Sequence, residues 1–253
     1  MPEIKTKHED IIRKEKLDEA LKHLSLLQKF GKPIVYEWRK EPKEGEDKGD
    51  LQREEIVIHY PMIRTLVCLL FLFGKRISEV LVLKRGDFYI RRGYLYVRFM
   101  ISKKPTRTAL AMPIVKIKRV SIKNQREYVQ PILDYIATLN DGNLPLFPGS
   151  SRPHTLIVKR KDKKTGKIIK EYKYEVKREG VMSRVQAYKI LKALDEEFYP
   201  HWFRHSLATA LAEEGFTAHE LKDWFDWSRY DTASSYVEGM PSMTARISAR
   251  KIT

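Results

Sequence analysis

The sequence predicts an α+β fold that is mostly helical, with a small antiparallel sheet and an extra basic β-hairpin. Three patterns point to this class. Apolar residues recur at helical spacing towards both ends of the chain, residues 94–101 alternate as a strand does, and residues 154–179 read as two β-like arms around a Lys-Thr-Gly-Lys turn. The chain has 253 residues, 42% of them hydrophobic, which is enough for a sizeable core without disulfide or metal support.

The first third of the chain contains three expected helices and a loop. Residues 8–30 are predicted to form an amphipathic helix, because leucines and isoleucines recur there near helical spacing. Residues 41–55 combine Pro, Gly and dense charge, which predicts an exposed loop. An apolar helix is expected over 57–73, with Gly74 ending it, and a second helix over 75–83.

The middle of the chain contains the predicted strands. Residues 87–101 and 107–115 are expected to be strands, and residues 125–139 a helix. In the basic hairpin, residues 159–178 hold ten Lys or Arg against three acids. From Ser183 onward the sequence is typical of helices. They are expected over 183–198, 201–214, 218–226, 231–238 and 242–251.

The charge balance indicates a polyanionic partner. Lys and Arg number 49 against 33 Asp and Glu, so the formal net charge is +16, and the pI is near 9.7. Nucleic acid is the polyanion that such a chain most often binds.

The single cysteine, Cys68, excludes a disulfide framework and a Cys-based zinc cluster. It lies in an apolar run over 66–73 that is too short to span a bilayer, so it is expected to be a small buried hydrophobic residue. The N-terminus is charged and has no apolar signal core. We therefore expect no membrane insertion and a cytoplasmic, nucleoid-associated location.

Three segments carry the residues suited to chemistry. The first holds Arg76 and Glu79, which are helical i, i+3 neighbours able to pair. The second holds His201, Arg204 and His205, whose i, i+3, i+4 spacing places all three on one helical face. The third runs from Leu221 to Tyr236 and includes Trp227.

Together these residue types suit phosphoryl transfer. A lone Arg usually forms a surface ion pair, and a lone His is usually a structural residue. The prediction of an active site therefore rests on the combination of these residues. Two guanidinium forks, Arg76 and Arg204, fit the non-bridging oxygens of a phosphodiester. A phenol such as Tyr236, with an ordinary pKa near 10, becomes a nucleophile when positive charge or a base is near. The sequence contains no metal-binding motif and no Gly-rich phosphate loop, so neither a metal nor another cofactor is expected.

The combined pattern resembles the tyrosine recombinases, the integrase family of site-specific DNA recombinases. Arg76-Ile77-Ser78-Glu79 matches the first family motif, and His201, Arg204 and His205 match H-x-x-R-H. The third motif is a Leu-Gly-His-like turn nine residues before the nucleophile. Trp227 takes the place of its His, and Tyr236 follows nine residues later. The resemblance covers roughly residues 57–240.

The resemblance implies a mechanism and roles. Tyr236 would attack the scissile phosphate and form a 3′-phosphotyrosyl link, while Arg76 and Arg204 hold the phosphoryl oxygens. His201 would act in proton transfer or hydrogen bonding, and His205 and Trp227 would support the same group. The family places a catalytic Lys in a β-hairpin after the first Arg. Both Lys103 and Lys104 fit as general acid, with a slight preference for Lys104.

The resemblance also implies an organisation and partners. Residues 1–55 would be an N-terminal helix and charged loop without a full core-binding domain, 56–240 the catalytic domain, and 241–253 a tail able to dock on a neighbour. Double-stranded DNA would be bound by a homo-oligomer, as a tetramer. The 154–179 hairpin looks like an insertion. It would either add contacts to DNA phosphates or be a surface excursion without a binding role. The expected DNA-binding residues are Arg107, Lys159, Arg160, Lys161, Lys163, Lys164, Tyr188 and Lys189.

Two rival functions share the expected fold. A type IB topoisomerase-like enzyme would use the same chemistry as a monomer that relaxes supercoils. A DNA-binding protein that has lost catalysis would keep the fold alone. Every reactive position is filled in this chain, which argues against the second rival.

Overall fold

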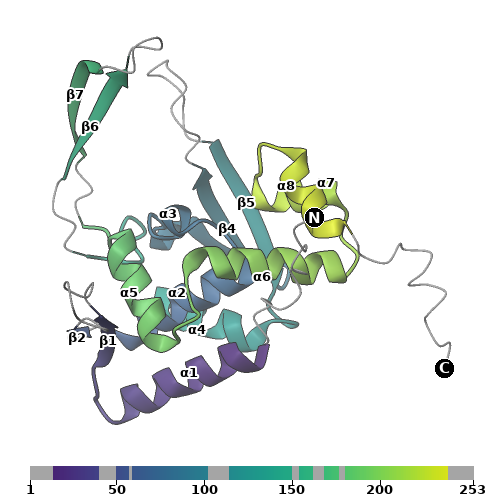
Figure 1. Cartoon of the computed structure of the whole chain (residues 1–253). Coiled ribbons are helices and arrows are strands. Elements are labelled where there is room, and N and C mark those ends of the chain that lie inside the picture. The colour runs from purple at the N-terminus through teal and green to yellow at the C-terminus, as the bar shows by residue number, and fades with distance from the viewer. Residues whose placement is uncertain are drawn as a thin grey trace.

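The computed structural model describes residues 14–39, 50–56, 59–101, 114–149, 154–161, 168–176 and 180–238, and for 154–161 and 168–176 it describes the backbone alone. Figure 1 shows the chain as a helical body with small sheets. The elements, in chain order, are α1 (Lys14–Lys29), β1 (Ile34–Arg39), β2 (Leu51–Ile56), α2 (Tyr60–Phe73), α3 (Ile77–Val80), a 3-10 turn (Arg85–Asp87), β3 (Phe88–Arg91), β4 (Tyr94–Ile101), β5 (Ile114–Ser121), α4 (Arg126–Ala137), β6 (His154–Lys161), β7 (Ile168–Val176), α5 (Arg184–Leu194), α6 (Pro200–Glu213), α7 (Ala218–Phe225) and α8 (Tyr230–Val237).

The main core forms around α2, which is apolar nearly all round. Ten of its residues are buried, Cys68 among them, as the apolar run predicts. It packs against α4, α6 and α1, and α6 crosses it in Figure 1. Within the described part of the chain, no helix is both long and apolar enough to cross a bilayer.

The central sheet has three antiparallel strands in the order β3-β4-β5. The alternation predicted for β4 is confirmed, because Val97, Phe99 and Ile101 are buried while Arg98 and Met100 between them are exposed. The predicted strand over 87–101 is in fact two strands. Gly93, at φ +77°, helps to turn the chain between them. β5 begins at Ile114, so most of the strand predicted over 107–115 lies outside the described residues.

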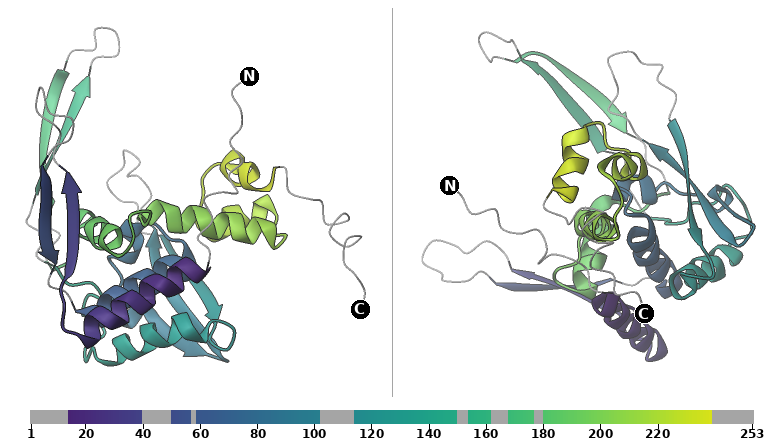
Figure 2. Two further views of the ribbon diagram at one scale, coloured as in Figure 1. Left: turned by 60° about the horizontal axis from the view of Figure 1, so that its bottom comes forward. Right: turned by 90° about the vertical axis from the view of Figure 1, so that its right-hand side faces the viewer.

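Two further sheets are two-stranded ribbons. β6 pairs with β7, in agreement with the two arms predicted for 154–179. This hairpin projects away from the body in both views of Figure 2. β1 pairs with β2, which the sequence reasoning did not anticipate. The expectation of a loop over 41–55 is wrong from Leu51 onward, because these charged residues complete a ladder with the β-branched and aromatic strand β1.

The remaining helices follow the expected order, with one shorter than predicted. The helix expected over 75–83 is limited to the four residues of α3. Helices α4 to α8 lie within or close to their predicted ranges. The helix expected over 242–251 lies outside the described residues.

Helices α6, α7 and α8 share a second, smaller core. Its buried members are Ala208, Ala212, Ala218, Leu221, Phe225 and Ala233. Because four of these six side chains are single methyl groups, the three helices can approach closely. Trp227 and Tyr236 pack against this cluster, so it fixes where the predicted nucleophile lies.

Gly74 joins the two cores. It ends α2 in the left-handed region, with φ +55°, and its N–H donates to Leu70 O at 2.9 Å. A Cβ added there would lie 2.7 Å from Phe225 Cε1 and 3.0 Å from Leu207 Cδ2. The close approach of α2 to α6 and α7 therefore requires glycine.

We expect Gly74→Ala to lower the free energy of unfolding by about 2 to 4 kcal/mol, because it adds overpacking to left-handed strain. Gly31→Ala is the matched control, since Gly31 has φ +61° and nothing within 4 Å of its added Cβ. It should cost only about 1 kcal/mol. Urea unfolding measures both, and equal losses would contradict the packing argument.

Candidate active site

Arg76 is held at the start of α3 by Glu79. The carboxylate accepts from the guanidinium Nη1 at 2.9 Å and from the Arg76 backbone N–H at 3.2 Å. The side chain of Glu79 is 2% exposed, whereas that of Arg76 is 46% exposed. A buried carboxylate thus orients a guanidinium that still reaches solvent, as a binding cation must.

Arg204 is almost fully buried, at 3% exposure, on α6. Nη1 donates to Gly74 O at 3.0 Å, and Nη2 donates to Phe225 O. The guanidinium also lies 5.0 Å from the Phe225 ring centroid and 5.3 Å from that of Trp227. A guanidinium has five N–H donors, so the two hydrogen bonds to carbonyls fix its plane and leave other N–H groups able to bind an anion.

The two guanidinium groups interact with each other. Burial and, second to it, the neighbouring charge of Arg76 lower the pKa of Arg204 to about 10, while Glu79, Asp226 and Tyr236 act in the opposite direction. Mutual repulsion between two held cations favours an anion between them. The structure therefore brings the first two predicted motifs to one place.

Tyr236, on α8, contacts the second and third motifs. Its Oη lies 2.9 Å from His205 Nδ1, and its ring stacks on Trp227 with centroids 5.2 Å apart and planes 9° from parallel. Burial raises the pKa of the phenol, and the charge of Arg204 partly offsets that rise. The phenol is therefore protonated near neutral pH, and deprotonation requires an acceptor.

The position of Trp227 depends on the turn that follows α7. Asp226, at φ 54°, ends the helix in the left-handed region. The Trp227 N–H donates back to Lys222 O at 3.1 Å, as in the usual left-handed helix termination. In the Leu-Gly-His-like motif, Asp226 stands at the glycine position.

Sequence reasoning gave no role to Lys75 or Asp226, which lie next to these groups, and it did not predict that Lys118 is buried. Lys75 is fully buried, forms an ion pair with Asp226 and donates to Trp224 O at 2.7 Å. Lys118 is 8% exposed and donates to Asp223 O at 2.7 Å. Two features of the sequence could have indicated these residues. Lys75 directly follows the apolar helix and its terminal glycine, and Asp226 is an acid at the glycine position of the Leu-Gly-His-like motif.

A cleft opens beside these groups. The cations that line it are Arg76, Lys116, Arg184 and Lys222, and Trp227 forms part of its wall. Asp223 and Asp226 also line the cleft. Lys116 Nζ lies 3.7 Å and 3.9 Å from their carboxylates, so it partly compensates their negative charge. The cleft can therefore accept an anionic chain next to Arg76.

The other predicted residues are placed as follows. His201 lies on the first turn of α6 and is exposed. Tyr188 is 42% exposed on α5. Lys189 pairs with Glu54 and lies over the rings of Tyr36 and Trp38, so it holds the β1–β2 ribbon on α5. Lys159, Arg160 and Lys161 are in β6, where the backbone alone is described, and Lys103, Lys104, Arg107, Lys163 and Lys164 lie outside the described residues.

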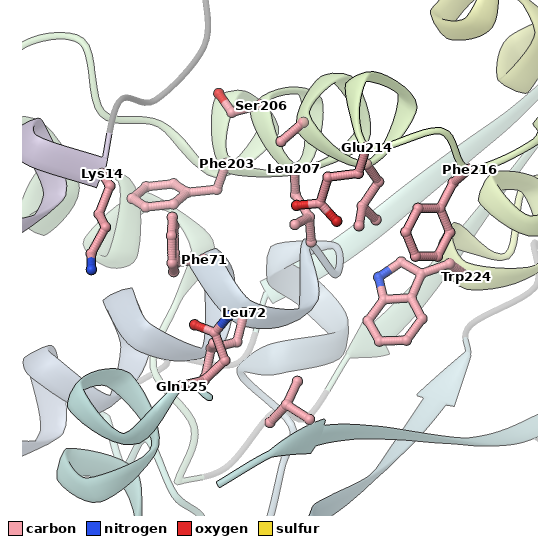
Figure 3. A pocket seen from close by; sticks show the side chains of 13 residues that line it. Lys14, Phe71, Leu72, Gln125, Phe203, Ser206, Leu207, Glu214, Phe216 and Trp224 are labelled. Carbon is pink, nitrogen blue, oxygen red and sulfur yellow. The ribbon is translucent and has the colours of Figure 1, made fainter. Parts of the chain in front are cut away.

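A second cavity, of about 390 Å³, is mostly apolar. Figure 3 shows Phe71 and Leu72 of α2 facing Phe203 and Leu207 of α6, with Trp224 at one end. None of the sequence-predicted site residues that the structure describes lines this cavity. The cleft beside Arg76 and Trp227 is the one that candidate residues line.

The fold and the grouped side chains define a tyrosine recombinase catalytic domain. Residues 57–242 match the model of the phage integrase family, and the chain belongs to that family. The sequence-based prediction of this fold and family is thus confirmed, and DNA recombination and integration are the activities of the class.

Solved structures of recombinases share the fold. The XerH site-specific recombinase bound to difH substrate, in a pre-cleavage complex, matches with a TM-score of 0.52 and 14% identity over 90% of this chain. XerH in a post-cleavage complex with palindromic difH matches with a TM-score of 0.51 and 12% identity over 89%. The matches cover 50% and 48% of those chains, so this chain spans about half their length. No curated protein sequence matches the chain.

Proposed function

We propose that the protein is a site-specific DNA recombinase that cuts and rejoins strands through a 3′-phosphotyrosyl intermediate. The observation that carries the proposal is the contact of Tyr236 with His205 and Trp227 beside the buried guanidinium of Arg204. Family membership supports the class of reaction. The difH complexes of XerH support duplex DNA as the partner.

The proposed first step breaks one phosphodiester and makes another. Tyr236 Oη attacks the scissile phosphorus and loses its proton to His205 Nδ1, which accepts in the tautomer without a proton on that nitrogen. Arg76 and Arg204 hold the two non-bridging oxygens as charge builds on them. The P–O5′ bond breaks, and Lys103 or Lys104 supplies the proton for the free 5′-hydroxyl. His201 is assigned a hydrogen bond at the edge of the site.

The second step reverses the first with a different strand. A 5′-hydroxyl attacks the phosphotyrosyl ester and releases Tyr236, and the ester conserves the bond energy, so no ATP is consumed. Strand exchange between two duplexes requires several protomers, and we propose a homotetramer on DNA. The basic β6–β7 hairpin and Tyr188 on α5 are proposed to contact DNA outside the cleft.

The test uses half-site DNA with a nick just 3′ of the scissile phosphate, so that the short fragment with the free 5′-hydroxyl diffuses away and the adduct is trapped. We expect a covalent protein–DNA product in which peptide mapping finds the modification on Tyr236. A product on another residue would refute the assignment. Plasmid relaxation without recombination between two sites would instead identify a topoisomerase-like enzyme.

A further inference from the structure

The C-terminal end of α7 is covered by cations from three other parts of the fold. Three consecutive carbonyls each accept from a different buried side chain. Asp223 O accepts from Lys118 Nζ, Trp224 O from Lys75 Nζ, and Phe225 O from Arg204 Nη2. The donors come from β5, from the junction of α2 with α3, and from α6.

This arrangement completes a helix end. The last carbonyls of an α-helix have no partner within the helix, and its C-terminus carries partial negative charge. Cations placed there satisfy both needs, but burying them is unfavourable. Burial lowers the pKa of Lys75 to about 8 despite its pairing with Asp226, and burial likewise lowers the pKa of Lys118. The fold thus retains two buried ammonium groups at a cost in solvation.

The carbonyl contacts have a geometric consequence for the active site. Lys75 immediately precedes Arg76, and the three carbonyls that accept from Lys75, Lys118 and Arg204 belong to the last turn of α7 before Trp227. Lys118 also lies 5.4 Å from the ring centroid of Trp224. These side chains, which donate to backbone carbonyls of α7, therefore connect the sheet and the Arg76 turn to the end of α7.

Asp226 links the same elements through its side chain. It adopts φ 54°, a conformation that glycine adopts without strain. Its carboxylate is nearly buried and forms the ion pair with Lys75. An acid at this position needs its lysine, since an uncompensated buried charge is strongly destabilising.

We propose that Lys75 and Lys118 are positioning residues for the reaction under "Proposed function", on which this inference rests. They hold the end of α7 so that Trp227 and Arg204 face the same phosphate as Arg76. They act through other residues and are not proposed to touch the substrate.

The experiment separates a positioning role from simple support of the fold. Lys75→Met alone leaves the nearly buried Asp226 carboxylate without its ion pair to Lys75 and with the more distant Lys116, at 3.9 Å, as a cation neighbour, so the Tm of this variant should fall. In Lys75→Met/Asp226→Gly the carboxylate is gone and glycine fits the left-handed turn, so the Tm should recover. The Trp224 carbonyl, however, still lacks its cation. We therefore expect the single-turnover rate of adduct formation, at saturating half-site DNA, to stay about 10- to 100-fold below that of the wild type.

Lys118→Met should show the same loss of rate, with the DNA Kd within about threefold of the wild-type value. Lys22→Met is the matched control, because Lys22 is an exposed lysine on α1 and its loss removes the same charge. It should leave the rate unchanged. A wild-type rate in the folded double variant, or in folded Lys118→Met, would overturn the positioning role.

A second readout does not depend on cleavage. The indole N–H resonance of Trp227, assigned with Trp227→Phe, is recorded by ¹⁵N NMR without DNA. It should move in Lys118→Met and in the double variant and stay in place in Lys22→Met. If the wild type forms no adduct, the proposed function fails, and this resonance alone decides the positioning role. An unmoved resonance in both variants overturns it.

Discussion

Tyr236→Phe is expected to abolish the covalent protein–DNA adduct, with a loss of about 10⁴-fold or more in the rate of its formation. The variant lacks the oxygen that would bond to phosphorus, but it keeps the ring that stacks on Trp227. DNA binding should therefore stay within about threefold of the wild-type value. Denaturing gels with end-labelled half-site DNA measure the adduct, and gel shifts measure binding.

Tyr230→Phe is the control for this change. Tyr230 begins the same helix and is 53% exposed, so removal of its hydroxyl should leave the adduct unchanged. Adduct formation that persists in Tyr236→Phe would show that another residue is the nucleophile. Loss of the adduct in Tyr230→Phe alone would identify that residue instead.

Arg204→Lys is expected to lower the rate of adduct formation by about 10²- to 10³-fold. A lysine keeps the charge but cannot donate to Gly74 O and Phe225 O while also meeting a phosphate oxygen with the geometry of a planar fork. The loss should appear in the single-turnover rate at saturating DNA rather than in the DNA Kd.

Arg229→Lys is the control for the Arg204 variant. Arg229 precedes α8, and its exposed guanidinium pairs with Asp231 at 2.9 Å. An exposed pair of this kind contributes little, so the rate should not change. If Arg204→Lys reacted at the wild-type rate, a point charge would suffice at this position, and the proposed bidentate contact with phosphate would be wrong.

Local pattern was sufficient to predict most of the helical fold. The apolar run of α2 and its end at Gly74 follow from spacing and backbone freedom within one segment. The strand β4 follows from its alternation. The β1–β2 ribbon was not predicted, because β2 is a charged sequence that becomes a strand only through its partner and through the contact of Lys189 with Tyr36 and Trp38.

The candidate residues could be found from the sequence because their types and spacing form a known combination. Their arrangement in space could not be predicted from the sequence. The contact of His205 with Tyr236 spans 31 residues, and that of Lys75 with Trp224 spans 149. Such contacts depend on how α6, α7 and α8 pack on one another and on the sheet.

The sequence by itself determined the family and the residues suited to phosphoryl transfer, since both depend on short motifs. Tertiary structure alone decided that Arg204 is buried against two carbonyls and that Lys75 and Lys118 cover the end of α7. The physical reason is that desolvation and the completion of hydrogen bonds act between segments distant in the chain, where sequence spacing carries no information.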